Sequence, residues 1–298
     1  MSASNWPAWS RNRGGKSAGP GRGGLDHPQR PHPSSPVLLF KRILKFNREA
    51  PALGDKRVIK RYPVGHPFTF KAVVNLIGRD GEGSAIAGDT KGQDWAGRLT
   101  NLSASGASIQ LHSAAVALRG EPCTFRLSLD SYELVIPSMI AHFRTYAQYA
   151  LCGFSYCFPD DETRNAYAQL LEPVSIGASL VAVESRKIKQ DTEGLTKEQY
   201  AGSPTSVLSV WRHPANHAIY SFDFRMNDYG VRWSEGMSEV EPYGMAKATE
   251  GGKKSSSPFV HLTPVQLEEV HWLFCLAVPN LAKAVAIDIR KFMTQLVA

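Results

Sequence analysis

Between residues 66 and 158, apolar and polar positions alternate in short runs separated by turn residues. This is the pattern of β-strands that bury one face and expose the other. Strands are predicted at residues 68–76, 95–99, 107–111, 123–129, 134–145 and 149–158. Six short strands at this spacing favour an antiparallel β-barrel, because closure removes the exposed edges of the sheet.

After residue 158 the pattern becomes helical and then returns to strands. Acidic residues at 160–162 start a helix that reaches about residue 171, and a second helical stretch follows Pro173 to about residue 189. Residues 207–211, 219–225 and 231–233 predict a three-stranded meander, and 244–257 a flexible loop. Thr263 and Gln266 form a capping box for a helix at 264–278, and another helix is predicted at 281–296.

The predicted fold class is α+β. It combines a six-stranded antiparallel barrel and its closing helix with a small α+β unit, made of the meander and two helices. The predicted segments are a disordered basic tail rich in Gly and Pro at 1–36, a short basic amphipathic helix and linker at 37–54, the barrel with its helices at 55–189, a polar linker at 190–204 and the α+β unit at 205–298.

Positive charge is concentrated at the start of the chain. Residues 1–61 hold 13 Lys and Arg against 3 Asp and Glu, whereas the whole chain holds 34 against 27. The rest of the chain is therefore mildly acidic, and the net charge of +7 makes no strong case for nucleic-acid binding. Residues 37–48 have apolar positions at helical spacing among basic ones, which favours docking on this protein or a partner, with contact to an anionic membrane surface as the alternative.

Two motifs carry the candidate chemistry. Arg57 and Arg61 form an R-x-x-x-R pair before the first strand, and Asn101, Ser103 and Gly106 form an N-x-S-x-x-G turn between two strands. An arginine fork pairs bidentately with phosphate and meets the O6 and N7 acceptors of guanine. Asn and Ser hold tight turns, and Gly allows a left-handed backbone or the close approach of a ligand.

In this order the two motifs resemble the signature of PilZ domains, which are bacterial receptors for cyclic di-GMP. Residues 151–158, followed by the acidic helix start, are similar to the last strand and closing helix of that domain. The resemblance covers roughly residues 55–172. It implies a cyclic di-GMP site formed by Arg57, Arg61, Asn101 and Ser103, with Gly106 shaping the turn, and no further cofactor.

The resemblance also implies a non-enzymatic cytoplasmic receptor in which the ligand draws the arginine arm against the barrel. The signal would then pass to a protein partner, or to self-association, through the C-terminal unit. An alternative is a PilZ-fold adaptor that binds no nucleotide and acts through protein contacts.

Other chemistries find little support in the sequence. No GGDEF, EAL or HD-GYP motif is present, so synthesis or breakdown of the dinucleotide is not expected. Nothing in the spacing makes His213, His217 and the nearby Glu235, Glu239 and Glu241 converge on a metal. The four cysteines contain no C-x-x-C pair and are expected to be free thiols. Neither a signal peptide nor a membrane-spanning segment is expected.

Overall fold

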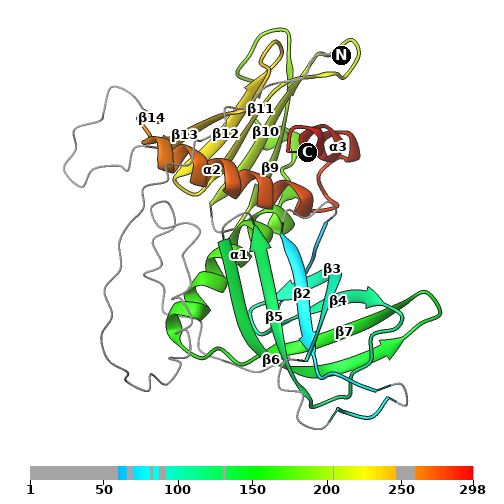
Figure 1. The fold of residues 1–298 in the computed structure, drawn as a ribbon. Coiled ribbons are helices and arrows are strands. Elements are labelled where there is room, and N and C mark those ends of the chain that lie inside the picture. The colour runs from blue at the N-terminus through cyan, green and yellow to red at the C-terminus, as the bar shows by residue number, and fades with distance from the viewer. Residues whose placement is uncertain are drawn as a thin grey trace, which may run out of the picture. The chain divides into compact units, whose positions relative to one another are not determined.

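The computed structural model describes residues 60–65, 70–80, 83–86, 92–129, 132–203, 205–245 and 259–297. The predicted tail at 1–36, the amphipathic segment at 37–54, Arg57 and most of the predicted loop at 244–257 lie outside these residues. Strands form the first part of the described chain (Figure 1). They are β1 (Arg61–Pro63), β2 (Lys71–Leu76), β3 (Gln93–Ser103), β4 (Gly106–His112), β5 (Pro122–Leu129), β6 (Tyr132–Thr145) and β7 (Tyr149–Tyr156).

Six of these strands close into an antiparallel barrel. Neighbouring strands pair in the order β3-β2-β5-β6-β7-β4, and β4 pairs with β3 again. The 11 residues of β3 allow this closure, because its first half pairs with β2 and its second half with β4. β1 also pairs with the second half of β3. The predicted six-stranded barrel is confirmed.

The alternation of side chains accounts for the barrel core. In β6, residues Tyr132, Leu134, Ile136, Ser138 and Ile140 are buried, and the residues between them are exposed. Successive side chains of a strand point to opposite faces, so every second residue meets the interior. Phe125, Leu127 and Ile109 from neighbouring strands are fully buried there.

One long helix, α1 (Asp161–Ser179), packs against the barrel. The Asp160 side chain caps it by accepting a 2.6 Å hydrogen bond from the Thr163 amide, as the acidic helix start predicts. The separate helix predicted after Pro173 is wrong, because α1 continues through this proline and ends at Ser179. Val174 and Ile176 are fully buried, and their burial compensates for the hydrogen bond that Pro173 cannot donate.

A second antiparallel sheet follows, with the strand order β14-β13-β12-β11-β10-β9-β8. Within the described residues it comprises β8 (Val181–Ala182), β9 (Thr196–Gly202), β10 (Ser206–Arg212), β11 (Ile219–Met226), β12 (Tyr229–Ser234), β13 (Glu241–Met245) and β14 (Phe259–Val260), with a short 3-10 turn η1 (Ser185–Lys187) between β8 and β9. The predicted meander is the centre of this larger sheet. The linker predicted at 190–204 is wrong for residues 196–202, which pair with β10 along its whole length.

Two helices pack with this sheet, α2 (Pro264–Ala277) and α3 (Ile287–Gln295), and the short 3-10 turn η2 (Val278–Asn280) follows α2. The predicted capping box is confirmed, since Thr263 and Gln266 exchange side-chain and backbone hydrogen bonds. The last helix begins six positions later than predicted, at Ile287. None of the helices in the described ranges is long and apolar enough to cross a membrane.

Close backbone contact joins α1 to the end of α2. A Cβ atom on Gly177 would collide with the carbonyl oxygen of Ala277, so only glycine permits this approach. The Gly177 carbonyl accepts a 3.0 Å hydrogen bond from the Ala282 amide. A further link connects the barrel to η2, because the Gly65 amide donates to Asn280 Oδ1 at 2.9 Å.

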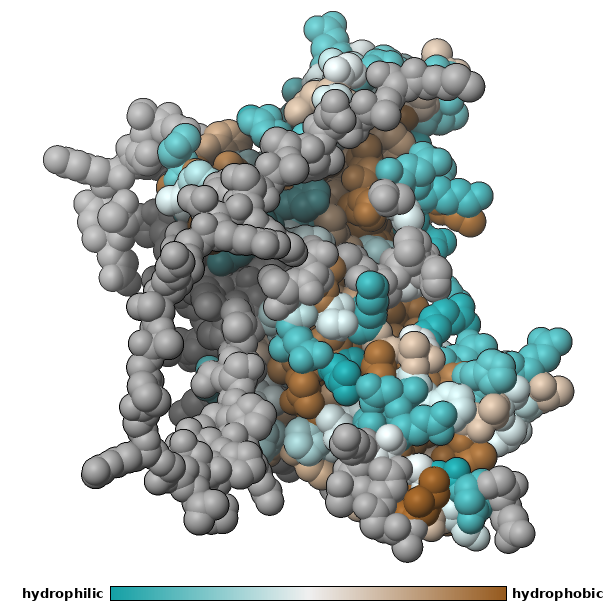
Figure 2. All heavy atoms as spheres, viewed as in Figure 1, coloured by the Kyte–Doolittle hydropathy of each residue, from teal (hydrophilic) through white to brown (hydrophobic). Residues whose placement is uncertain are grey.

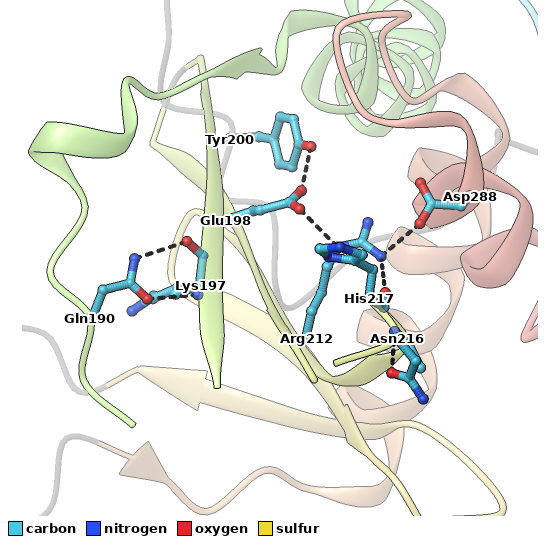
Figure 3. A network of polar contacts seen from close by, with 9 residues as sticks. Gln190, Lys197, Glu198, Tyr200, Arg212, Asn216, His217 and Asp288 are labelled. Atoms are coloured by element: carbon cyan, nitrogen blue, oxygen red, sulfur yellow. Dashed lines mark hydrogen bonds and ion pairs between the residues drawn. The ribbon is translucent and has the colours of Figure 1, made fainter. Parts of the chain in front are cut away.

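A buried arginine ties α3 to the second sheet (Figure 3). Arg212, on β10, is 5% exposed and forms ion pairs with Glu198 of β9 at 2.8 Å and Asp288 of α3 at 2.7 Å. It also donates to the His217 carbonyl at 2.8 Å. Burial tends to raise the pKa of Asp288, but the hydrogen bond and charge of Arg212 hold that pKa below its ordinary value.

Replacing Arg212 by Met is expected to lower the free energy of unfolding by about 1–3 kcal/mol, because the Glu198 and Asp288 carboxylates and the His217 carbonyl lose a charged donor. Urea unfolding of the full chain measures this change. The part contributed by Asp288 is present above its unfolded-state pKa and is lost as pH falls through its lower folded-state pKa. Arg186→Met, which removes an exposed pair with Glu184, is the control and should change stability by less than about 0.5 kcal/mol.

Candidate functional site

The N-x-S-x-x-G turn is held from behind by two buried tyrosines. Ser103 Oγ donates to the Gly106 carbonyl at 3.0 Å, which closes the turn. Tyr167 of α1 donates its hydroxyl to the Ser103 carbonyl at 2.8 Å, and Tyr156 of β7 donates to the Tyr167 oxygen at 3.0 Å. Burial raises the pKa of both tyrosines, so both hydroxyls stay protonated as donors. The closing helix therefore fixes the position of the turn.

Strand β1 brings the described half of the arginine motif to the turn. Arg61 lies opposite Ser103, and Pro63 lies opposite Asn101. Directly opposed residues of a sheet point to the same face, so Arg61, Asn101 and Ser103 share the outer face of the barrel. Arg57 precedes the described residues. The structure thus brings four of the five predicted site residues together, namely Arg61, Asn101, Ser103 and Gly106.

A β-bulge at Thr100 orients this part of β3. Leu99 pairs with Ile109 and Asn101 pairs with Ser108, which leaves Thr100 as an extra residue. Leu99 and Leu102 are both buried although they are three positions apart. Without the extra residue, Asn101 would point into the barrel core. Bulges of this kind re-aim side chains and are common beside functional sites.

Gly106 does not adopt the left-handed backbone that is one of its two predicted roles. It is not among the described glycines with positive φ. A Cβ atom here would collide with the carbonyl oxygen of Phe154 on β7. Glycine is required because β4 and β7 approach each other closely. The predicted left-handed backbone is wrong, and the close approach of a ligand at this position stays a prediction.

The outer face around Arg61 is positively charged. Arg98 and Arg144 lie on the same face of neighbouring strands, and the strands β1, β4 and β7 contain no Asp or Glu. The acids of β3 and β6, Asp94 and Glu133, both lie within 4.0 Å of Arg126. Among the described residues, none forms a hydrogen bond or ion pair with the Arg61 side chain. The site is therefore suited to an anion.

The sequence does not predict the residue that supports the turn from behind, nor the residues that extend the site across β7 and β6. Tyr167 lies 64 positions after Ser103, and no local pattern links the two. His142 of β6 and Gly153 of β7 lie in the same cross-strand row as Asn101 and Ser108. Their placement depends on strand register, which the sequence does not display.

Other groups do not build a second site. Within the described ranges, no group of three or more His, Cys, Asp and Glu could hold a metal ion. His213 instead lies 3.3 Å from Glu235. All four cysteines are free, and burial raises the pKa of the Cys123 and Cys152 thiols to about 12. These two thiols are protonated at neutral pH and unreactive.

Solved structures that are similar to this chain include two PilZ domains. The PilZ domain of CeSA from a cellulose-synthesizing bacterium is 20% identical, and the match covers 37% of this chain and 93% of that chain with a TM-score of 0.26. The PilZ domain of YcgR from Escherichia coli, solved with c-di-GMP, is 11% identical and covers 39% and 88%, with a TM-score of 0.28. No protein-family model and no curated protein matches the chain. Both matches cover less than two fifths of this chain.

Removing the Tyr167 hydroxyl tests how the turn is held. Tyr167→Phe is expected to cost about 1–2 kcal/mol of stability, because the Ser103 carbonyl and the Tyr156 hydroxyl lose a buried partner. Hydrogen exchange should become faster at residues 103–106. Tyr146→Phe, at an exposed tyrosine, is the control. Equal exchange rates in the wild-type chain and Tyr167→Phe would contradict this role.

Proposed function

We propose that this chain is a non-enzymatic receptor for cyclic di-GMP. The observation that carries the proposal is the pairing of Arg61 with Ser103 on an outer face that also holds Asn101. Three side chains from the two motifs thereby lie on a face where the described strands β1, β4 and β7 carry no carboxylate. Arg57 lies four positions before Arg61 and belongs to the same arm.

The chemistry of the ligand matches these groups. Cyclic di-GMP has two phosphates and two guanines, and a guanidinium fork pairs with phosphate or with the guanine O6 and N7 atoms. The Asn101 amide supplies both donors and an acceptor for a base edge. The Ser103 hydroxyl donates its proton to the Gly106 carbonyl, so toward a ligand it can act only as an acceptor.

Strand β1 could transmit the effect of ligand binding to the C-terminal unit. β1 ends at Pro63, and two residues later the Gly65 amide donates a hydrogen bond to Asn280 Oδ1. Asn280 is buried and also donates to the Leu276 carbonyl at the end of α2. A ligand that orders the arm would therefore restrain η2 and the end of α2. A ligand shifts such an equilibrium only by its differential affinity for the two states.

An adaptor without nucleotide binding is the second candidate, and exposed apolar residues favour it. Val260, Val265 and Leu267 lie close in sequence in the C-terminal unit and are 48%, 43% and 38% exposed. Such residues suit a protein partner or self-association. Figure 2 shows hydrophobic and hydrophilic residues intermixed over much of the coloured surface.

Replacing Arg61 by Ala is expected to weaken cyclic di-GMP binding by about 10-fold to 100-fold, because a bidentate contact contributes about 1–3 kcal/mol. Arg61→Lys should recover only part of the loss, since an ammonium is a point charge. Calorimetric titration of the full chain measures both affinities.

Arg119→Ala is the matched control, because Arg119 is an exposed arginine in the loop between β4 and β5. It should bind as the wild-type chain does, and GTP should not compete. Folded wild-type protein that binds no cyclic di-GMP would overturn the receptor proposal and leave the adaptor.

Cyclic di-GMP is expected to slow hydrogen exchange at residues 61–65 and also at 276–282, because Gly65 is bonded to Asn280. In Asn280→Ala, protection should remain in the barrel and disappear at 276–282. Exchange mass spectrometry at saturating ligand measures both segments. Protection of 276–282 that persists in the variant would show that this contact does not transmit the signal.

A further inference from the structure

A second β-bulge lies on the far side of the site, in β6. Ile140 pairs with Phe154 and His142 pairs with Gly153, so Ala141 is an extra residue. Without it, Ala141 would stand opposite Gly153 and His142 would point toward the core. The bulge therefore brings the imidazole to the outer face, as the bulge at Thr100 does for Asn101.

Gly153 lets the imidazole lie directly on the backbone of β7. A Cβ atom at this position would overlap Cε1, Nε2 and Nδ1 of His142. Because three ring atoms would overlap this Cβ, the imidazole lies over the Gly153 Cα atom. Any other residue would displace it. The position of His142 thus depends on a bulge in its own strand and on a glycine in the next.

Two cross-strand rows connect His142 to the motif residues. One row is Asn101, Ser108, Gly153 and His142, and the other is Arg61, Ser103, Gly106, Ser155 and Met139. The residues of β4 and β7 between the two sides are Gly or Ser. Their short side chains leave a flat floor, with Arg61 and Asn101 on one side and His142 on the other.

The electrostatic surroundings keep His142 uncharged. Burial lowers its pKa, and the cations of Arg61 and Arg144 lower it further. Among the described residues, no hydrogen bond to either ring nitrogen is formed. A neutral imidazole offers one donor, one acceptor and a flat face.

We propose that His142 is a base-contacting residue of the site, and that its ring stacks on or hydrogen-bonds to a purine whose phosphate meets Arg61. This inference rests on the proposed function and deepens it. Side chains with flat rings bind bases through their π-faces, and each stack contributes substantially to affinity. The arrangement assigns phosphate binding to the arm and base binding to β6.

Calorimetric titration with cyclic di-GMP of the full-length wild-type chain and four variants tests this role. His142→Ala is expected to weaken binding about tenfold or more, whereas His142→Phe should retain much of the affinity because it keeps a flat ring. Gly153→Ala should also weaken binding, because its Cβ displaces the imidazole. His112→Ala is the control, since His112 is an exposed histidine at the opposite end of β4.

The double variant His142→Ala/Gly153→Ala separates ligand contact from damage to the fold. It should bind no more weakly than His142→Ala, because Gly153 acts through the ring that is already absent. Additive losses would overturn the inference, as would wild-type affinity in His142→Ala. In both cases the receptor proposal would stand, provided that the wild-type chain binds. If the folded wild-type chain does not bind, the receptor proposal and this inference fail together.

Discussion

The structure depends on the pairing of β3 with three other strands, β1, β2 and β4. Its 11 residues pair with β2 in the first half and with β4 in the second, and Asn101 to Ser103 also pair with β1. Closure of the barrel and attachment of the arginine arm therefore use the same strand. The bulge at Thr100 allows both, since Leu99 and Leu102 stay in the core while Asn101 lies on the outer face of the barrel.

This constraint links the chemistry of the site to the packing of the whole chain. The turn after β3 is supported by Tyr167 of α1, and α1 continues to Gly177, where it meets the end of α2. The segment after β1 is also linked to the C-terminal unit, because the Gly65 amide donates a hydrogen bond to Asn280. The candidate site is thus connected to the C-terminal unit by the helix behind the turn and by the arm in front of it.

Much of the barrel could be predicted from the sequence, and the reasons for the misses are physical. The alternation in β6 and the two motifs can be recognised because each involves residues that are close together in the sequence. The sequence of β9 resembles a linker because Lys197, Glu198 and Gln199 are polar, yet Glu198 pairs with Arg212 and Lys197 with Asp191. Such strands are stabilised by distant partners, so local hydrophobicity does not reveal them.

The motif residues of the site can be predicted from the sequence, but His142 and Gly153 cannot. Asn101, Ser103 and Arg61 stand in recognisable spacings, and the structure places them on one face. His142 and Gly153 come from β6 and β7, and they face the motif only because a single bulged residue changes the register of β6. A one-residue shift reverses every side chain beyond it, and no sequence pattern marks that shift.

The most direct test of the central claim is NMR mapping of cyclic di-GMP on the isotopically labelled full chain. The account predicts that chemical shifts change first and most at Arg61, Asn101, Gly106 and Gly153, and in the His142 side chain. Changes confined to the second sheet, or none at saturating ligand, would contradict a site on the outer face of the barrel.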